Sequence, residues 1–326
     1  MTVLVTGVAG FIGFQTARQL LGRGSRGIGV DNLNDYYDVS LKQARLDVLK
    51  SHDRFDFECL NIADRLAVAD LLSKHGDISR VIHLASQAGV RHSLVDPYAY
   101  TNSNIEGQLV LLESCRKLSR LDHFVYASSS SVYGGNTKLP FSIQDPVDSP
   151  LSVYAASKRS MELLAYSYAH IYAIPLTGLR FFTVYGPWGR PDMAAMIFIR
   201  AILARKSIPV FNNGDMRRDF TYIDDIVAGV MACLDKPPSA ADGRPPWRVY
   251  NIGNNQSEPL MRFISVLEES LGNKADIDFQ PLQTGDVPET SADITETQRD
   301  LGYEPKTTID VGLPKLVAWY RDYYGT

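Results

Sequence analysis

Gly7-Val8-Ala9-Gly10-Phe11-Ile12-Gly13 is the segment of this sequence that says most about its fold. It follows the short apolar run Val3-Leu4-Val5, which is typical of a buried strand, and precedes an amphipathic stretch from Phe14 to Leu21, which is typical of a helix. In this context a glycine turn predicts a site for the pyrophosphate of a dinucleotide, because the helix N-terminus offers free N–H groups and the positive end of its dipole.

Each glycine of the turn has its own task. Gly7 permits the tight turn, Gly10 lets the backbone approach a phosphate, and Gly13 lets the helix pack closely on the strand. Phe11 and Ile12 complete the segment that we expect to contact the dinucleotide. A tight turn without a ligand would carry the same glycines, so the surrounding residues decide between the two interpretations.

An acidic residue closes the second predicted strand, Gly27 to Asp31. Asp31 lies 18 residues beyond Gly13, where a carboxylate accepts hydrogen bonds from the adenosine ribose hydroxyls and repels a 2′-phosphate. The next residue is Asn32 rather than an arginine. The sequence therefore predicts NAD rather than NADP as the cofactor, with Arg45 and later basic residues as the counter-argument.

Strand-like and helix-like segments alternate through the first half of the chain. The predicted strands cover residues 3–5, 27–31, 56–60, 80–84, 123–127 and 176–180, and the predicted helices cover 14–21, 67–74, 102–118 and 152–171. This alternation predicts an α/β fold, a Rossmann-type doubly wound parallel sheet with helices on both faces. We expect an NAD-binding domain at residues 1–184 and a smaller mixed α/β substrate-binding region at 185–326, with room for more than one crossing between them.

The composition suits a globular protein with a large core: 45% of the 326 residues are hydrophobic, and the net charge is −4. An acidic balance gives no electrostatic reason to expect nucleic acid or an anionic membrane as a partner. Cys59, Cys115 and Cys233 lie far apart without metal-ligand spacing, which predicts free thiols, no metal site and a reducing, cytoplasmic compartment. We expect neither a signal peptide nor a membrane span, because no apolar run approaches roughly 20 residues.

A tyrosine and a lysine share one face of a predicted helix. Tyr154 and Lys158 are four residues apart, and a nearby ammonium together with an oxidised nicotinamide would lower the phenol pKa from its usual value near 10. Tyr154 would then remove a hydroxyl proton while hydride leaves the same carbon. The run Ser128 to Ser131 ends the fifth predicted strand, where ligands bind in open α/β sheets, and one of its hydroxyls would assist.

These residues belong to longer motifs: Thr6 to Gly13, His83-Leu84-Ala85, Ser130 to Gly134 and Tyr154-Ala155-Ala156-Ser157-Lys158. Together they resemble the extended short-chain dehydrogenase/reductase superfamily over nearly the whole chain, and within it the nucleotide-sugar 4-epimerases. Three stretches are similar to UDP-glucuronate 4-epimerases in particular: Ala88 to Arg91, Leu179 to Met193, and Gly285 to Thr290.

The resemblance implies tightly held NAD that stores the C4 hydride while Tyr154 takes the proton of the sugar 4-OH, after which the 4-keto sugar turns over and is reduced on its other face. It identifies Ser129 as the third catalytic residue beside Tyr154 and Lys158, and Asn104 as a residue that shapes the site and orients Lys158. It places further residues against the cofactor: Asn61, Ile62, Leu84, Ala85, Ser86 and Phe181.

The resemblance also implies a substrate site for a UDP-linked uronic acid. Arg190 resembles a carboxylate clamp, since a guanidinium binds carboxylate at two points; a purely structural arginine is the alternative. The other implied contacts are Ser129, Ser130 and Thr183 for the sugar, Val210 and Phe211 for uracil, Arg218 for the diphosphate and Asp286 for the ribose or loop. Gln283-Thr284 stands where many relatives carry a second diphosphate arginine, and Asn61 where many carry Asp.

Three other interpretations stay open at this point. The first is a 4-epimerase of a neutral UDP-sugar such as UDP-glucose, against which Arg190 argues. The second is a UDP-uronate decarboxylase. The third is a non-catalytic dinucleotide scaffold, against which the Ser129, Tyr154 and Lys158 set argues. The resemblance further implies a homodimer through the helices Asn102–Leu118 and Ser152–Ile171.

Overall fold

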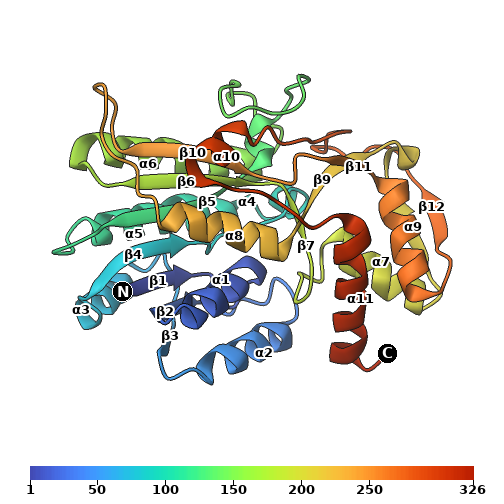
Figure 1. Cartoon of the computed structure of the whole chain (residues 1–326), viewed down its shortest axis with the longest axis horizontal. Helices are drawn as coiled ribbons and strands as arrows, with labels where there is room; N and C mark the ends of the chain where they lie inside the picture. Colours follow the sequence, from blue (N-terminus) through green and yellow to red (C-terminus); the bar gives the residue numbers. More distant parts are fainter.

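A computed structural model describes residues 1–326. A seven-stranded parallel sheet forms its centre, in the order β10-β6-β5-β4-β1-β2-β3 (Figure 1). The strands are β1 Thr2–Thr6, β2 Arg26–Asp31, β3 Phe55–Cys59, β4 Ile78–His83, β5 His123–Ser129, β6 Leu176–Phe181 and β10 Trp247–Ile252. The strand order reverses at β1, whose neighbours are β2 and β4, so the predicted doubly wound sheet is confirmed.

Helices cover both faces of this sheet. One layer contains α1 Phe11–Gly22, α2 Val39–Lys50 and α8 Ile223–Leu234; the other contains α3 Arg65–Lys74, α5 Gly107–Cys115 and α6 Val153–Tyr172. Alternate residues of β1 serve the two cores, since Val3 and Val5 pack with α1 and α8 while Leu4 packs with α3, α5 and α6. The central strand β1 is therefore buried on both faces, as is typical of a parallel sheet, whereas the edge strand β3 is partly exposed.

The long helix expected at 102–118 is built differently. The short α4, Pro97–Tyr100, leads into a π-helix at Thr101–Glu106, and only then does α5 begin. A π-helix is a locally widened stretch of helix, and the spacing of hydrophobic residues in the sequence does not reveal it. In the large sheet and its covering layers, α2 and the strand β10 also have no counterpart among the predicted segments.

The C-terminal part forms two small sheets beside the large one (Figure 1). They contain β7 Thr183–Tyr185, β8 Ser207–Val210, β9 Arg217–Tyr222, β11 Ser257–Pro259 and β12 Asp276–Phe279. The helices of this part are α7 Ala194–Leu203, α9 Leu260–Leu271, α10 Thr295–Leu301 and α11 Ile309–Tyr324. Because α8 packs on α1 and β10 joins the large sheet, the chain returns to the first part after residue 184, and the two-domain division stays a prediction.

Local chemistry explains how the turn and helix that matter most are formed. Gly7 has a φ of +70°, and a Cβ at Gly13 would collide with the Gly7 carbonyl oxygen. Ser152 caps α6, since its Oγ accepts a hydrogen bond from the N–H of Ala155 at 3.1 Å. No helix is both long and apolar enough to cross a membrane.

Candidate active site

A single large cavity of about 840 Å³ runs along the carboxyl ends of the central strands and is closed on its other side by the C-terminal part. It collects most of the residues that the sequence singled out. Those lining it are Gly7, Gly10, Phe11, Ile12, Gly13, Asp31, Asn32, Asn61, Ile62, Leu84, Ala85, Ser86, Ser129, Ser130, Tyr154, Lys158, Phe181, Thr183, Arg190, Phe211, Arg218 and Asp286. Asn104 and Val210 are fully buried and do not line it.

The glycine turn forms one end of the cavity. The N-terminus of α1 has no side-chain cap and no acidic residue in its first turn, so its N–H groups face an anion without competition. A Cβ at Gly10 would lie 2.9 Å from the Gly7 carbonyl oxygen, and glycine keeps this cradle open. The residues present therefore fit the pyrophosphate of a dinucleotide.

Asp31 is fixed beside this cradle. Its Oδ2 accepts a hydrogen bond from the Ala9 N–H at 3.1 Å, and its Oδ1 accepts one from the Leu33 N–H at 2.9 Å. The carboxylate is thus oriented by the turn itself, at the position predicted for ribose recognition. Arg45, the counter-argument to NAD, does not line the cavity; its guanidinium is fully buried and donates to the carbonyl oxygens of Ala9 and Trp188.

Tyr154 and Lys158 lie in the first turns of α6, at the end of β5. The Nζ atom of Lys158 is buried, donates to the Ala127 carbonyl oxygen at 3.0 Å and lies 6.0 Å from the centroid of the Tyr154 ring. The Ser129 hydroxyl lies near the Tyr154 phenol, whose pKa it lowers, and its Oγ accepts a hydrogen bond from the Ser131 N–H at 3.2 Å. The three predicted catalytic side chains are therefore brought to one wall of the cavity.

Burial governs the ionisation of this group. It lowers the pKa of the Lys158 ammonium to about 7. Burial also raises the pKa of the Tyr154 phenol, and the neighbouring Ser129 hydroxyl opposes that rise only in part. Lys158 alone thus does not produce the expected lowering of the phenol pKa, because its own charge is destabilised by burial and lies 6.0 Å from the ring.

Asn104 does not line the cavity but hydrogen-bonds to a residue that does. Its side-chain amide donates to the Gln87 carbonyl oxygen at 3.0 Å and to Ser157 Oγ at 2.9 Å, and its Oδ1 accepts from the Gln87 N–H at 2.8 Å. It makes no hydrogen bond with Lys158, its implied partner. The π-helix therefore fixes the backbone of the segment Leu84 to Gln87, which lines the cavity.

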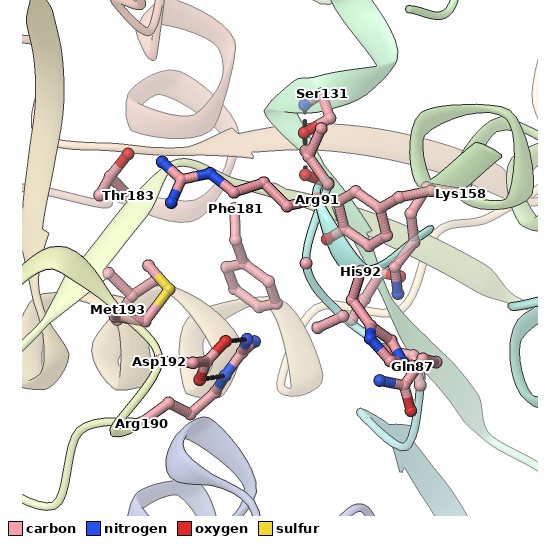
Figure 2. A pocket seen from close by; sticks show the side chains of 18 of the residues that line it. Gln87, Arg91, His92, Ser131, Lys158, Phe181, Thr183, Arg190, Asp192 and Met193 are labelled. Carbon is pink, nitrogen blue, oxygen red and sulfur yellow. Dashed lines mark hydrogen bonds and ion pairs between the residues drawn. The ribbon is translucent and has the colours of Figure 1, made fainter. Parts of the chain in front are cut away.

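The end of the cavity where the sugar is predicted to bind is bounded by polar groups from two loops. Arg190 pairs with Asp192 through two hydrogen bonds, and the Tyr36 hydroxyl donates to the same carboxylate at 3.1 Å. Figure 2 shows this pair on one side of the pocket, with Lys158 across from it. Asp192 occupies Nε and Nη2 of Arg190, which leaves Nη1 free of that pair.

Two arginines flank the far end. Arg218 pairs with Asp286 at 2.7 Å and donates to the Pro288 carbonyl oxygen at 2.9 Å. Arg91 forms no ion pair; its guanidinium stacks over the Phe211 ring, 4.7 Å from the centroid, and extends across the pocket in Figure 2. Arg91 belongs to the Ala88 to Arg91 motif, but the sequence predicted no role for it. The absence of an arginine at Gln283-Thr284 was the signal that could have pointed to a cation elsewhere in the chain.

Of the two residues predicted to contact uracil, only one faces the cavity. Phe211 lines it, whereas Val210, the last residue of β8, belongs to the core beneath. Alternation along the strand accounts for the difference, since neighbouring side chains of a strand point to opposite sides.

Comparison with known proteins identifies relatives of this arrangement. The family described as the NAD dependent epimerase/dehydratase family matches residues 3–253. UDP-glucuronate 4-epimerase 4 of Arabidopsis thaliana is 47% identical, with 99% of this chain and 76% of the plant protein aligned. The crystal structure of UDP-glucuronic acid 4-epimerase from Bacillus cereus, in complex with UDP-glucuronic acid and NAD, superposes with a TM-score of 0.92 at 35% identity, over 99% of this chain and 100% of the other. A UDP-glucose 4-epimerase of Thermotoga maritima, solved with UDP-glucose, gives 0.88 at 30% identity, over 99% and 100%.

Proposed function

We propose, from the fact that this chain belongs to the NAD dependent epimerase/dehydratase family, that it interconverts UDP-glucuronate and UDP-galacturonate by inverting C4 of the sugar. One observation carries the proposal: the glycine turn, the Ser129, Tyr154 and Lys158 set, and the Arg190 turn all line one cavity. The plant and Bacillus relatives, which carry the same activity in their names, support the choice of a uronic acid.

The cofactor site fits NAD, which when bound accepts the C4 hydride and later returns it. The turn Gly7 to Gly13 binds the pyrophosphate through α1, and Asp31 binds the adenosine ribose. The segment Leu84 to Ser86, held through Gln87 by Asn104, lines the nicotinamide side together with Phe181. Asn32, Asn61 and Ile62 line the adenosine side.

Tyr154 carries the proton. Its phenol removes the proton of the sugar 4-OH, and the Ser129 hydroxyl, which lines the cavity beside it, binds the same sugar oxygen and assists the transfer. Lys158 binds the nicotinamide ribose and stabilises the phenolate. Because burial raises the phenol pKa and disfavours the Lys158 charge, the positive charge of oxidised NAD is needed to stabilise the phenolate further. After the 4-keto sugar turns over, Tyr154 returns the proton to the inverted alcohol.

The uronic acid is held by a cation and hydroxyls. Arg190 binds the sugar carboxylate through Nη1 while Asp192 fixes the guanidinium from its other edge. Ser130 and Thr183, which line the same cavity, bind sugar oxygens. Holding the carboxylate matters because the 4-keto intermediate is a β-keto acid, which loses CO2 readily when its carboxylate is free to rotate.

The UDP part lies between Phe211 and the two arginines. Phe211 and the Val210 backbone contact uracil, Asp286 orders Arg218, and Arg91 with Arg218 neutralises the diphosphate. Arg91 thereby replaces the arginine missing at Gln283-Thr284. Guanidinium groups suit this role because their N–H groups match phosphate oxygens at two points.

We further propose a cytoplasmic homodimer. The paired α5 and α6 lie on one flank of the sheet, and α6 exposes Leu163, Tyr166 and Ile171. A four-helix interface of α5 and α6 from two copies would bury these side chains. The three cysteines are free, as a reducing compartment requires.

The test compares substrates. Purified protein is incubated with UDP-glucuronate, UDP-glucose or UDP-galacturonate, and products are resolved by chromatography and NMR, with CO2 measured in parallel. The proposal predicts interconversion of the two uronates without CO2. Conversion of UDP-glucose alone would identify a neutral-sugar epimerase instead, and release of CO2 with a UDP-pentose would identify a decarboxylase.

A further inference from the structure

Arg45 joins three segments of the site without touching the cavity. From the middle of α2 its fully buried guanidinium donates through Nη1 to the Ala9 carbonyl oxygen at 2.7 Å and to the Tyr37 hydroxyl at 2.8 Å. Through Nη2 it donates to the Trp188 carbonyl oxygen at 2.6 Å. Ala9 lies inside the glycine turn, and Trp188 comes two residues before Arg190.

Burying a cation without a counter-charge destabilises the fold, so a functional reason is needed for an arginine at this position. Arg45 has no carboxylate within ion-pair distance, and all of its partners are neutral oxygens. Burial lowers its pKa, while the more distant Asp31 favours its charge and Arg190 disfavours it. A methionine, whose volume is similar, would occupy the space without desolvating a charge, so packing alone does not account for an arginine here.

The neighbourhood of Trp188 shows why its carbonyl needs a fixed partner. Trp188 has a φ of +66°, a backbone conformation that side chains rarely adopt. Its ring packs against Phe14 of α1 at 5.1 Å and Trp319 of α11 at 5.4 Å between centroids. The turn that carries Arg190 is therefore built directly on the helix that follows the glycine turn.

From this geometry we infer that Arg45 is a positioning residue. It fixes the position of the glycine turn, which would hold the cofactor, relative to the turn that carries Arg190, which would hold the substrate. We call this relative position the register of the two turns. The inference rests on the proposed function, which assigns NAD to the first turn and the uronate to the second. A planar guanidinium has its N–H groups in a rigid fork, so it ties the Ala9 and Trp188 carbonyls to each other at a fixed spacing. Hydride transfer at C4 depends on such spacing, since displacements of about 1 Å cost large factors in rate.

Register matters twice in one turnover. The hydride must leave C4 toward the nicotinamide and return to the same carbon after the 4-keto sugar has turned over. A loosened register slows both transfers and gives the intermediate time to escape. Escape leaves reduced cofactor on the protein, which absorbs and fluoresces where oxidised cofactor does not.

The experiment compares Arg45→Lys, Arg45→Met and Tyr37→Phe with Arg54→Lys as the matched control, because Arg54 also donates to a backbone carbonyl but is exposed. The readouts are NAD content of the purified protein, the dissociation constant for UDP, kcat with UDP-glucuronate, and nicotinamide fluorescence during turnover. We expect both Arg45 variants to lose at least tenfold in kcat, to hold less NAD and to accumulate reduced cofactor. Affinity for UDP should change less than threefold.

Tyr37→Phe keeps the buried cation and removes one partner, so it should shift NAD content and fluorescence in the same direction by a smaller factor. This variant decides the matter if the Arg45 variants do not fold. NAD content, kcat and fluorescence within twofold of wild type in folded Arg45→Lys and in Tyr37→Phe would overturn the inference. A parallel loss of NAD content and UDP affinity would overturn it too, by showing a general structural role. If wild type does not act on UDP-glucuronate, the proposed function is wrong. The NAD content of wild type and the variants would then still test whether Arg45 positions the cofactor turn.

Discussion

The guanidinium of Arg190 is held by the carboxylate of Asp192, two residues further along the chain, with Nε 3.0 Å from Oδ1 and Nη2 2.5 Å from Oδ2. Tyr36 donates a third hydrogen bond to the same carboxylate. The residue proposed to recognise the uronate therefore has its orientation fixed by its own turn. Preorganisation of this kind removes the cost of ordering a long side chain when substrate binds.

Replacing Arg190 tests this recognition. Arg190→Met should weaken UDP-glucuronate binding by about 10- to 100-fold, the range for a hydrogen bond to a charged group, and leave the affinity for UDP unchanged. Calorimetric titration with both ligands measures the difference. Asp192→Asn serves as companion: it keeps Arg190 but loosens it, and we expect a smaller loss for UDP-glucuronate. Equal losses for UDP and UDP-glucuronate in Arg190→Met would remove Arg190 from the carboxylate site.

Tyr154 is predicted to be indispensable for turnover and dispensable for cofactor binding. Tyr154→Phe removes only the hydroxyl that exchanges the proton, so epimerisation should fall by at least about 10²- to 10⁴-fold. The bound NAD, measured after denaturation of the purified protein, should match wild type. An active Tyr154→Phe variant would refute the proton path through Ser129 and Tyr154.

Arg91 and Arg218 are predicted to share the diphosphate. Arg91→Leu and Arg218→Leu should each lower the affinity for UDP by about tenfold or more, since each removes a charge-assisted contact. The affinity for uridine, which lacks the phosphates, should change little in Arg218→Leu and somewhat in Arg91→Leu, because Arg91 also stacks on Phe211. Unchanged UDP affinity in Arg91→Leu would leave the diphosphate to Arg218 alone.

A buried ion pair beneath the active site supplies a stability test. Glu162 of α6 accepts hydrogen bonds from Arg180 at 2.8 and 2.9 Å and from Ser128 at 2.7 Å. Glu162→Gln leaves Arg180 buried without its counter-charge, which should lower the free energy of unfolding by about 3–5 kcal/mol at neutral pH. Glu106→Gln, in the exposed pair with Arg65, should cost less than about 1 kcal/mol.

The same pair sets a pH dependence. Burial by itself raises the pKa of Glu162, but the hydrogen bonds and charge of Arg180, with Ser128 and Arg159, outweigh it and hold the pKa below 4.5. A carboxyl whose pKa is lowered by folding stabilises the fold above 4.5, and this contribution is lost as the pH falls through the folded value. Denaturant unfolding across pH 3 to 8 should therefore show the gap between wild type and Glu162→Gln narrowing below 4.5. A gap that widens there would contradict the lowered pKa.

The sequence was informative where a function depends on local spacing. Gly7, Gly10 and Gly13 predicted the strand–turn–helix unit because each glycine has a steric reason, and Tyr154 with Lys158 predicted a shared helix face. It failed where tertiary contacts decide. The π-turn around Asn104, the return of β10 to the large sheet and the burial of Val210 follow from packing that no local pattern reports.

Charged residues show the same division. Asp31 lies at the end of β2 and lines the cavity, as its position after the glycine turn predicted, while its binding of the ribose stays a prediction. Arg45 and Asp192 carried no comparable signal. Their partners lie on other loops or turn back on the same loop, so only the folded chain shows that Arg45 faces Ala9 and Trp188, and that Asp192 faces Arg190.

In the proposed reaction the hydride leaves C4 and returns to C4 while the cofactor stays on the protein. To test this, UDP-glucuronate carrying deuterium at C4 is incubated with the purified protein in ordinary water without added NAD, and the UDP-galacturonate formed is analysed by NMR and mass spectrometry. We expect product that keeps the deuterium at C4. Product that has exchanged it for a solvent proton, or formation of product only when NAD is added at every turnover, would contradict it.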